Sequence, residues 1–144
     1  MKVLSSVFAL LATTMFQSGT GTPAPATFVG RDVVTDCSKG ATLFMGPAYS
    51  VICYNRTQAG GGEIHEGFAH VWYIVDGEAM LVTGGTMMGT RVDALGEIRG
   101  TGLEGGESHH LVKGSVIVIP AGLPHWYKEI IKPVAYYAVN VDKK

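Results

Sequence analysis

The chain has 144 residues, of which 47% are hydrophobic and 16% are charged, and its formal net charge at pH 7 is −1. This length argues for a single domain, and this apolar content excludes an intrinsically disordered chain. A balance so near neutrality, without a basic stripe, gives no electrostatic attraction for nucleic acid or for an anionic membrane surface. The 20 glycines indicate a compact protein that is rich in turns.

Residues 1–26 differ in composition from the rest of the chain. One positive charge, Lys2, precedes an apolar run that ends at Phe16, and a small, polar, proline-containing stretch follows. This order is typical of a secretory signal peptide, and the apolar run is short for a membrane span. We predict cleavage within residues 18–26, a mature domain of residues 27–144 outside the cytoplasm, and no membrane attachment after cleavage. A membrane anchor and a disordered leader are the alternatives.

Two features bear on a secreted protein. Cys37 and Cys53 are the only cysteines, and in an oxidising compartment we predict a disulfide between them. Such a short loop would stabilise the fold by about 3 kcal/mol. Because Cys53 lies in a β-rich run, a buried free thiol is the alternative. The tripeptide that begins at Asn55 is an N-glycosylation sequon, which matters in a eukaryotic secretory pathway.

No stretch after residue 26 has a sustained apolar period of 3.6 residues, whereas short β-rich runs alternate with turn residues. Asp76 and Gly77 together are read as the turn of a β-hairpin. The chain is therefore predicted to be an all-β barrel or sandwich. The expected strands, in chain order, cover residues 27–29, 32–34, 40–45, 49–57, 63–65, 69–76, 78–83, 116–119 and 134–141, with a further strand that begins at residue 125.

Residues 86–107 form a glycine-rich spacer between these groups of strands. We interpret the spacer as an irregular excursion that contains a short hairpin. It is either a lid, in which Arg91 or Arg99 binds an anion, or a solvated loop or dimer contact.

Three histidines stand in expected strands. Alternate residues of a strand share a face. Two strands therefore carry same-face rows: Glu63 and His65 in the first, and His70, Trp72 and Ile74 in the second. His125 follows a rigid proline-glycine-proline turn and enters another strand. Three imidazoles and a carboxylate on adjacent strands form a ligand set for a divalent transition metal. For either His65 or His70 alone, an ordinary polar role on a half-exposed strand is the alternative.

The stretch that leads into His125 resembles the second motif of the cupin superfamily. That motif has a glycine, five residues, Pro-x-Gly, two residues and a histidine. Gly114, Pro120, Gly122 and His125 match it at full spacing. Glu129 stands where the motif ends with asparagine.

The first cupin motif is matched only in a degenerate form. Counting back from Gly77, the usual acidic position is His70, the second histidine is His65, and Glu63 stands where a first histidine is usual. Thr57 takes the place of the first glycine. The exchange of Glu63 and His70 preserves a set of three histidines and one carboxylate.

The resemblance covers residues 28–141 and implies a cupin-type double-stranded β-helix, or jelly-roll, barrel. It implies one divalent ion (Mn, Fe, Ni, Cu, Co or Zn) with one or two open coordination positions. The implied metal ligands are Glu63, His65, His70 and His125. Because cupins often pair through barrel edge strands, we also expect a homodimer.

The resemblance further implies a secreted metal-dependent enzyme that acts on a small organic molecule as a dioxygenase, isomerase or lyase. Tyr127 or Glu129 would move protons, and Glu66 or Glu129 would orient a histidine ligand. The expected pocket walls are Trp72, Ile74 and Trp126, with plain core packing of these side chains as the alternative. Two alternatives are a non-catalytic cupin that binds a small ligand or a metal outside the cytoplasm, and a structural β domain with a vestigial site.

Overall fold

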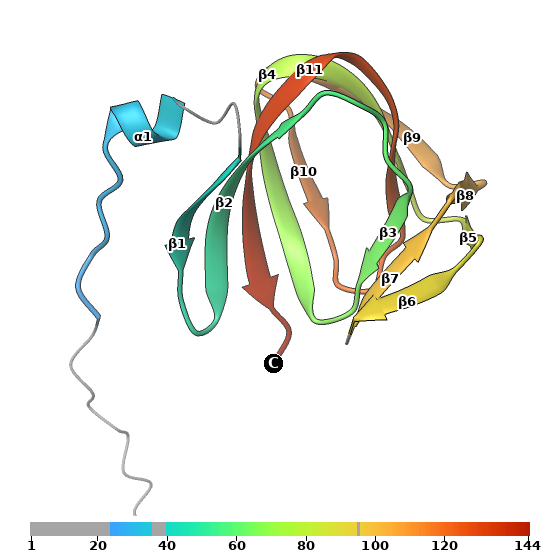
Figure 1. The fold of residues 1–144 in the computed structure, drawn as a ribbon, viewed down its shortest axis with the longest axis horizontal. Coiled ribbons are helices and arrows are strands. Elements are labelled where there is room, and N and C mark those ends of the chain that lie inside the picture. The colour runs from blue at the N-terminus through green and yellow to red at the C-terminus, as the bar shows by residue number, and fades with distance from the viewer. Residues whose placement is uncertain (1–23, 36–39, 95) are drawn as a thin grey trace, which may run out of the picture.

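The structure is a computed structural model that describes residues 24–35, 40–94 and 96–144. In these residues the chain forms one short helix and eleven strands, which curve into a barrel (Figure 1). The elements are α1 (Arg31–Thr35), β1 (Ala41–Met45), β2 (Tyr49–Arg56), β3 (Gly62–His65), β4 (Phe68–Thr83), β5 (Thr86–Met88), β6 (Arg91–Ala94), β7 (Glu97–Gly100), β8 (Gly102–Glu104), β9 (Glu107–Val112), β10 (Val116–Ile119) and β11 (His125–Asp142). The all-β prediction is confirmed.

The two longest strands, β4 and β11, form the frame of the barrel. They pair antiparallel along almost their whole length, from Phe68 opposite Asp142 to Thr83 opposite His125. On its other side β4 pairs with β9 and β10. β11 also pairs with β2 and β3. Both strands are rich in β-branched and aromatic residues, which suit a pleated, half-buried surface.

The hydrophobic core fills the inside of this frame. Its buried members are Trp72, Ile74, Ala79, Leu81, Leu111, Ile119, Tyr127, Val134, Tyr136 and Ala138. In β4 the inward residues have even numbers up to Ile74 and odd numbers from Ala79 onward. The change of phase occurs at Gly77, whose φ of 97° lies in the left-handed region. The predicted hairpin at Asp76–Gly77 is therefore wrong, because β4 continues through Gly77 and only bends there.

Residues 32–34 were expected to form a strand, but they belong to the single turn of α1. The carbonyl of Gly30 accepts hydrogen bonds from the amides of Val33 and Val34 and closes this turn. The predicted signal peptide falls largely on residues 1–23, which lie outside the described residues. In the part of the chain that the structure describes, no helix has the length and apolar character needed to cross a membrane.

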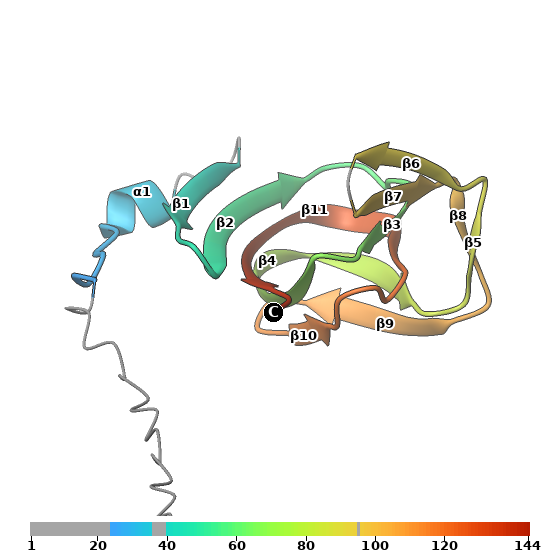
Figure 2. The same cartoon turned by 90° about the horizontal axis from the view of Figure 1, so that it is seen from below.

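The spacer at residues 86–107 is more regular than its composition suggests. β5 pairs with β8, and β6 pairs with β7. β7 also pairs with β3, which places Glu97 opposite His65 and Arg99 opposite Glu63. Figure 2 shows β6 and β7 on the side of the barrel away from β9 and β10. The spacer therefore adds a strand directly beside the histidine-bearing β3.

The bend at Gly77 gives a test of the fold. In Gly77→Ala the new Cβ would lie against the Pro133 carbonyl and 2.7 Å from the Val134 Cα. Strain at positive φ and this clash should together lower the free energy of unfolding by about 3 kcal/mol. Gly114→Ala is the matched control, because Gly114 has a φ of 88° and nothing within 4 Å of an added Cβ. It should cost about 1 kcal/mol. Equal urea midpoints for the two variants would contradict this account of the bend.

Candidate metal centre

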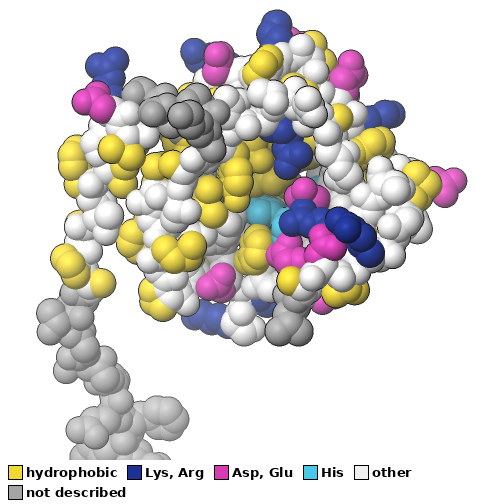
Figure 3. All heavy atoms as spheres, viewed as in Figure 1, with side chains coloured by type: hydrophobic (Ala, Val, Ile, Leu, Met, Phe, Trp, Pro, Cys, Tyr) yellow, Lys and Arg dark blue, Asp and Glu magenta, His cyan; other side chains and the backbone are white. Residues whose placement is uncertain are grey.

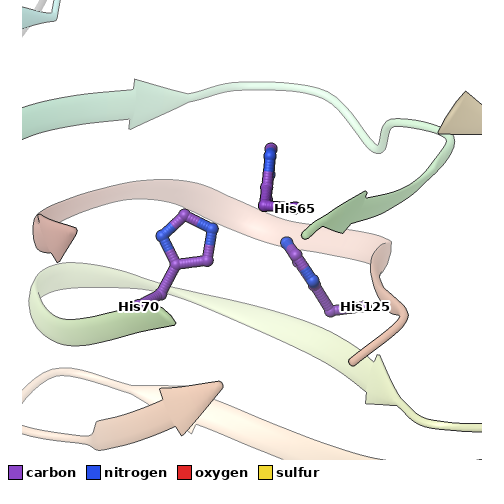
Figure 4. Close-up of side chains that lie close together, drawn as sticks. All are labelled: His65, His70 and His125. Atoms are coloured by element: carbon purple, nitrogen blue, oxygen red, sulfur yellow. The ribbon is translucent and has the colours of Figure 1, made fainter. Parts of the chain in front are cut away.

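Three histidines from three strands converge inside the barrel. His65 ends β3, His70 lies near the start of β4, and His125 begins β11. Their ligand atoms all lie within 4.8 Å of one another, and the rings point toward a common space (Figure 4). All three side chains are buried, and His125 is only 2% exposed. The predicted histidine set is thus brought together.

Each of these rings is held through its Nδ1 atom by an oxygen that can only accept. His65 Nδ1–H donates to Glu97 Oε1 at 2.8 Å, and His70 Nδ1–H donates to Asn140 Oδ1 at 2.7 Å. His125 Nδ1–H donates to the backbone carbonyl of Leu123 at 3.1 Å. A neutral imidazole carries one proton, so in the neutral form of each ring these bonds leave the lone pair of Nε2 free.

The free Nε2 atoms fit a metal ion. Those of His70 and His125 are buried and have no hydrogen-bond partner. Leaving buried polar atoms unpaired costs free energy, and a coordinated cation would satisfy them. Neutral imidazoles with hydrogen-bonded Nδ1 atoms are the usual form of metal-bound histidine. The donor set therefore suits a divalent transition ion. His65, His70 and His125 would bind this ion.

Burial keeps two of the histidines neutral. It lowers the pKa of His70 and of His125 to about 4, and the neighbouring histidines add to the effect. Burial also acts to lower the pKa of His65, but the contacts with Glu63 and Glu97 outweigh it and raise that pKa. His65 is therefore the first of the three rings to protonate as the pH falls.

Glu63 stands between the histidines and a pair of arginines. Its Oε2 atom lies 3.6 Å from Nε2 of His65 and 3.9 Å from Nε2 of His125. Its Oε1 atom lies 2.7 Å from Nη1 of Arg99 and 3.7 Å from Nη2 of Arg56. Burial opposes ionisation of Glu63, yet His65 and the two arginines lower its pKa to about 2. The carboxylate is thus charged and close to the three-histidine set without being part of its tight cluster.

The centre lies at the bottom of a hollow. Figure 3 shows histidine side chains on its floor and acidic and basic side chains around its rim. On the inner side Trp72 contacts the rings of His70 and His125, with centroid distances of 5.1 Å and 5.5 Å. Tyr127 stacks on Trp72 at 5.4 Å. Trp72 thus lies directly beside the centre, whereas Ile74 is a fully buried core residue.

Two predicted site residues lie on other faces. Trp126 is adjacent to His125 in β11 and points the opposite way, where its Nε1–H donates to the Gly60 carbonyl at 2.6 Å. Its prediction as a wall of the histidine pocket is therefore wrong. Glu129 is exposed, because the β4–β11 register slips between Tyr127 and Glu129 and turns Ile130 inward instead. The predicted roles of Glu129 as a base and as a partner of a histidine are wrong for this reason.

Glu66 is also exposed and was wrongly expected to orient a histidine. The residues that do so, Glu97 and Asn140, were not predicted. Asn140 has a recognisable signal, since it is a polar residue in phase with the inward Tyr136 and Ala138 of β11. Glu97 gave no comparable signal, because the spacer was read as irregular.

Two other predictions stay untested. Cys53 is fully buried in β2, but Cys37 lies outside the described residues, so the disulfide remains a prediction. Asn55 is half-buried in β2, and its glycosylation also remains a prediction.

The hydrogen bond from His70 to Asn140 should matter for metal affinity. Asn140→Leu removes the acceptor and should weaken binding of a divalent ion by about 10- to 100-fold, since the ring loses its fixed orientation. Titration with Zn²⁺ against a competing chelator measures this. Glu78→Leu is the control, because it removes the acceptor of a surface histidine, His110, at 2.9 Å. If Asn140→Leu bound Zn²⁺ as tightly as the parent, Asn140 would not be the residue that orients His70 for metal binding.

Metal affinity should depend on pH in two stages. Protons compete with the ion for Nε2, so affinity should fall about tenfold per pH unit once the pH drops below the raised pKa of His65. It should fall more steeply below about 4, where His70 and His125 also protonate. Glu97→Gln removes a charge that raises the pKa of His65, so the first stage should begin at lower pH. An unchanged onset in this variant would contradict the role of Glu97.

Comparison with known proteins supports the fold. The sequence matches no protein-family model and no curated protein. The structure is similar to BH2720 from Bacillus halodurans, with a TM-score of 0.57, 17% identity, and coverage of 83% of this chain and 84% of that chain. For KdgF from a Halomonas species the TM-score is 0.51, the identity 15%, and the coverage 73% and 80%. For the cupin domain of Schizosaccharomyces pombe Cnp3 the TM-score is 0.50 and the identity 12%, with coverage of 72% of this chain and 64% of that chain. The chain has the fold of the cupin superfamily, a double-stranded β-helix.

Proposed function

We propose that this protein is a metal-binding cupin that acts outside the cytoplasm as a metal-dependent enzyme on a small organic molecule. The observation that carries the proposal is the set of three inward Nε2 lone pairs, each fixed by a hydrogen bond at Nδ1. The signal-peptide pattern of residues 1–26, a positive charge followed by an apolar run and a small polar stretch, supports export.

The residues around the centre support chemistry on a partly apolar ligand. A bound divalent ion would supply Lewis acidity or, if redox active, access to dioxygen, so dioxygenase, isomerase and lyase reactions are the candidates. The buried ring of Trp72 provides an apolar wall on one side of the histidines. Burial raises the pKa of Tyr127 above its usual value, so its hydroxyl keeps its proton at neutral pH and can serve as a hydrogen-bond donor.

A non-catalytic cupin that binds a metal or a small ligand is the second candidate. It is favoured because, among the described residues, each carboxylate that could act as a base near the centre either faces outward or is paired with an arginine. Glu129 faces outward, while Glu63 and Glu97 are both paired with Arg99. Under this alternative the ligand would be bound and released unchanged.

Metal content tests the shared part of both candidates. Protein purified without an affinity metal and reconstituted should hold about one equivalent of a divalent ion, and His65→Ala with His125→Ala should hold none. His110→Ala is the matched control, because His110 is exposed and pairs with Glu78. Elemental analysis gives the result. A parent without metal after reconstitution, or a control that loses it, would contradict the centre.

Turnover separates the two candidates. With the metal known, oxygen uptake and product formation are screened over a panel of small organic molecules, with His65→Ala beside the parent. An enzyme should lose both metal and turnover in this variant. Saturable ligand binding by the parent with no chemical change in any ligand would favour the binding protein.

We also propose that the protein forms a homodimer through β10. Among the described residues, β10 is hydrogen-bonded to β4 alone, and Val116 and Val118 are each 61% exposed on its outer face. Antiparallel pairing with β10 of a second copy would cover this edge and bring the same valines together across a twofold axis. A second copy is therefore the occupant that this short edge fits best.

Light scattering at micromolar concentration should give the mass of a dimer. The double variant Val116→Lys, Val118→Lys places like charges in the contact and should be a monomer. Val92→Lys, at a residue 72% exposed on β6, is the control and should remain a dimer. A monomeric parent, or a dimeric double variant, would refute the proposal.

A further inference from the structure

Arg56 and Arg99 stand beside the three-histidine centre, and one half-buried carboxylate, Glu63, forms ion pairs with both. Arg99 Nη1 lies 2.7 Å from Glu63 Oε1, and Arg56 Nη2 lies 3.7 Å from the same oxygen. The two arginine side chains are only 30% and 28% exposed. The guanidinium of Arg56 also lies over the ring of Tyr127, 5.0 Å from its centroid. A guanidinium that is partly removed from water and stacked on an aromatic ring is well placed to bind a carboxylate.

We propose that Arg56 and Arg99 bind the carboxylate of a small organic acid, and that in the metal-free protein Glu63 occupies this position in its place. The proposal rests on the proposed function in one respect, namely that a divalent ion binds at the three histidines. It adds the substrate class, because the ligand must carry a negative charge next to its reacting part.

The charges near the mouth balance in the absence of an ion. Arg99 also lies 3.1 Å from Glu97 and 3.9 Å from Asp93, and Arg91 lies 3.2 Å from Asp93. Three arginines thus face three carboxylates: Arg56, Arg91 and Arg99 against Glu63, Glu97 and Asp93. An organic anion would find no net attraction there. A divalent ion on neutral histidines adds two positive charges, and an anion would then be attracted.

Glu63 links the ion to the arginines. Its Oε2 atom faces the Nε2 atoms of His65 and His125, while its Oε1 atom faces Arg99. An ion at the three Nε2 atoms attracts this carboxylate and weakens its hold on the arginines. The ion and Arg99 therefore compete for Glu63, and binding of the ion frees the arginines for the carboxylate of a ligand. By linkage, the ligand should in turn strengthen binding of the ion.

Benzoate and benzamide are suitable probes, because they have the same shape and only benzoate is charged. Calorimetric titration should show that benzoate binds the protein loaded with one equivalent of Zn²⁺ at least tenfold more tightly than the metal-free protein. Benzamide should bind at least tenfold more weakly than benzoate. Arg99→Gln and Arg56→Gln should each weaken benzoate binding about tenfold. Arg91→Gln is the matched control, because Arg91 is 71% exposed and pairs only with Asp93 among the ion pairs of the described residues.

Zinc affinity, measured in the same variants, separates this proposal from the proposed function. Arg99→Gln should bind Zn²⁺ several-fold more tightly than the parent, since Glu63 is no longer held by Arg99. A parent that binds no Zn²⁺ would refute the metal centre itself. A parent that binds Zn²⁺ but no benzoate at millimolar concentration would overturn the anion site alone. If Arg99→Gln and Arg56→Gln both retain Zn²⁺ and bind benzoate as tightly as the parent, the anion site is also overturned. Benzoate would then contact only the ion.

Discussion

The geometry of the centre depends on three hydrogen bonds at the Nδ1 atoms of the histidines. The acceptors come from different parts of the fold: a side chain of β7, a side chain of β11 and a backbone carbonyl in the turn before β11. Two of them are placed by strand pairing, since His65 lies opposite Glu97 and His70 opposite Asn140. A slip of one residue would turn either acceptor to the other face of the sheet. The geometry of the centre therefore depends on the strand register of the barrel.

The floor and the mouth of the hollow differ in their electrostatics. On the floor, burial keeps His70 and His125 neutral, and the ring of Trp72 packs against both of them. At the mouth, Glu63 remains charged because His65, Arg99 and Arg56 offset the cost of its burial. Neutral imidazole nitrogens next to an ionised carboxylate suit a divalent ion. The cupin fold alone does not select a reaction, so the function is argued from these side chains.

Local spacing in the sequence was sufficient to predict the histidines. The alternation of strand residues and the proline-glycine turn before His125 both act over a few residues, and the structure keeps them. The pairing of each acceptor with its histidine was out of reach, because His65 and Glu97 are 32 positions apart and His70 and Asn140 are 70 apart. Two local irregularities also changed the outcome. The bend at Gly77 replaced a hairpin, and the slip after Tyr127 turned Glu129 to the outside.

The central claim is that one divalent ion is held by the Nε2 atoms of His65, His70 and His125. Anomalous diffraction at the absorption edge of zinc, from crystals of the Zn²⁺-loaded protein, tests it most directly. The account predicts a single strong peak about 2.0–2.1 Å from all three Nε2 atoms, with the Nδ1 hydrogen bonds unchanged. A peak next to the Nδ1 atoms, a peak only elsewhere on the barrel, or no peak in crystals grown with excess Zn²⁺ would contradict it.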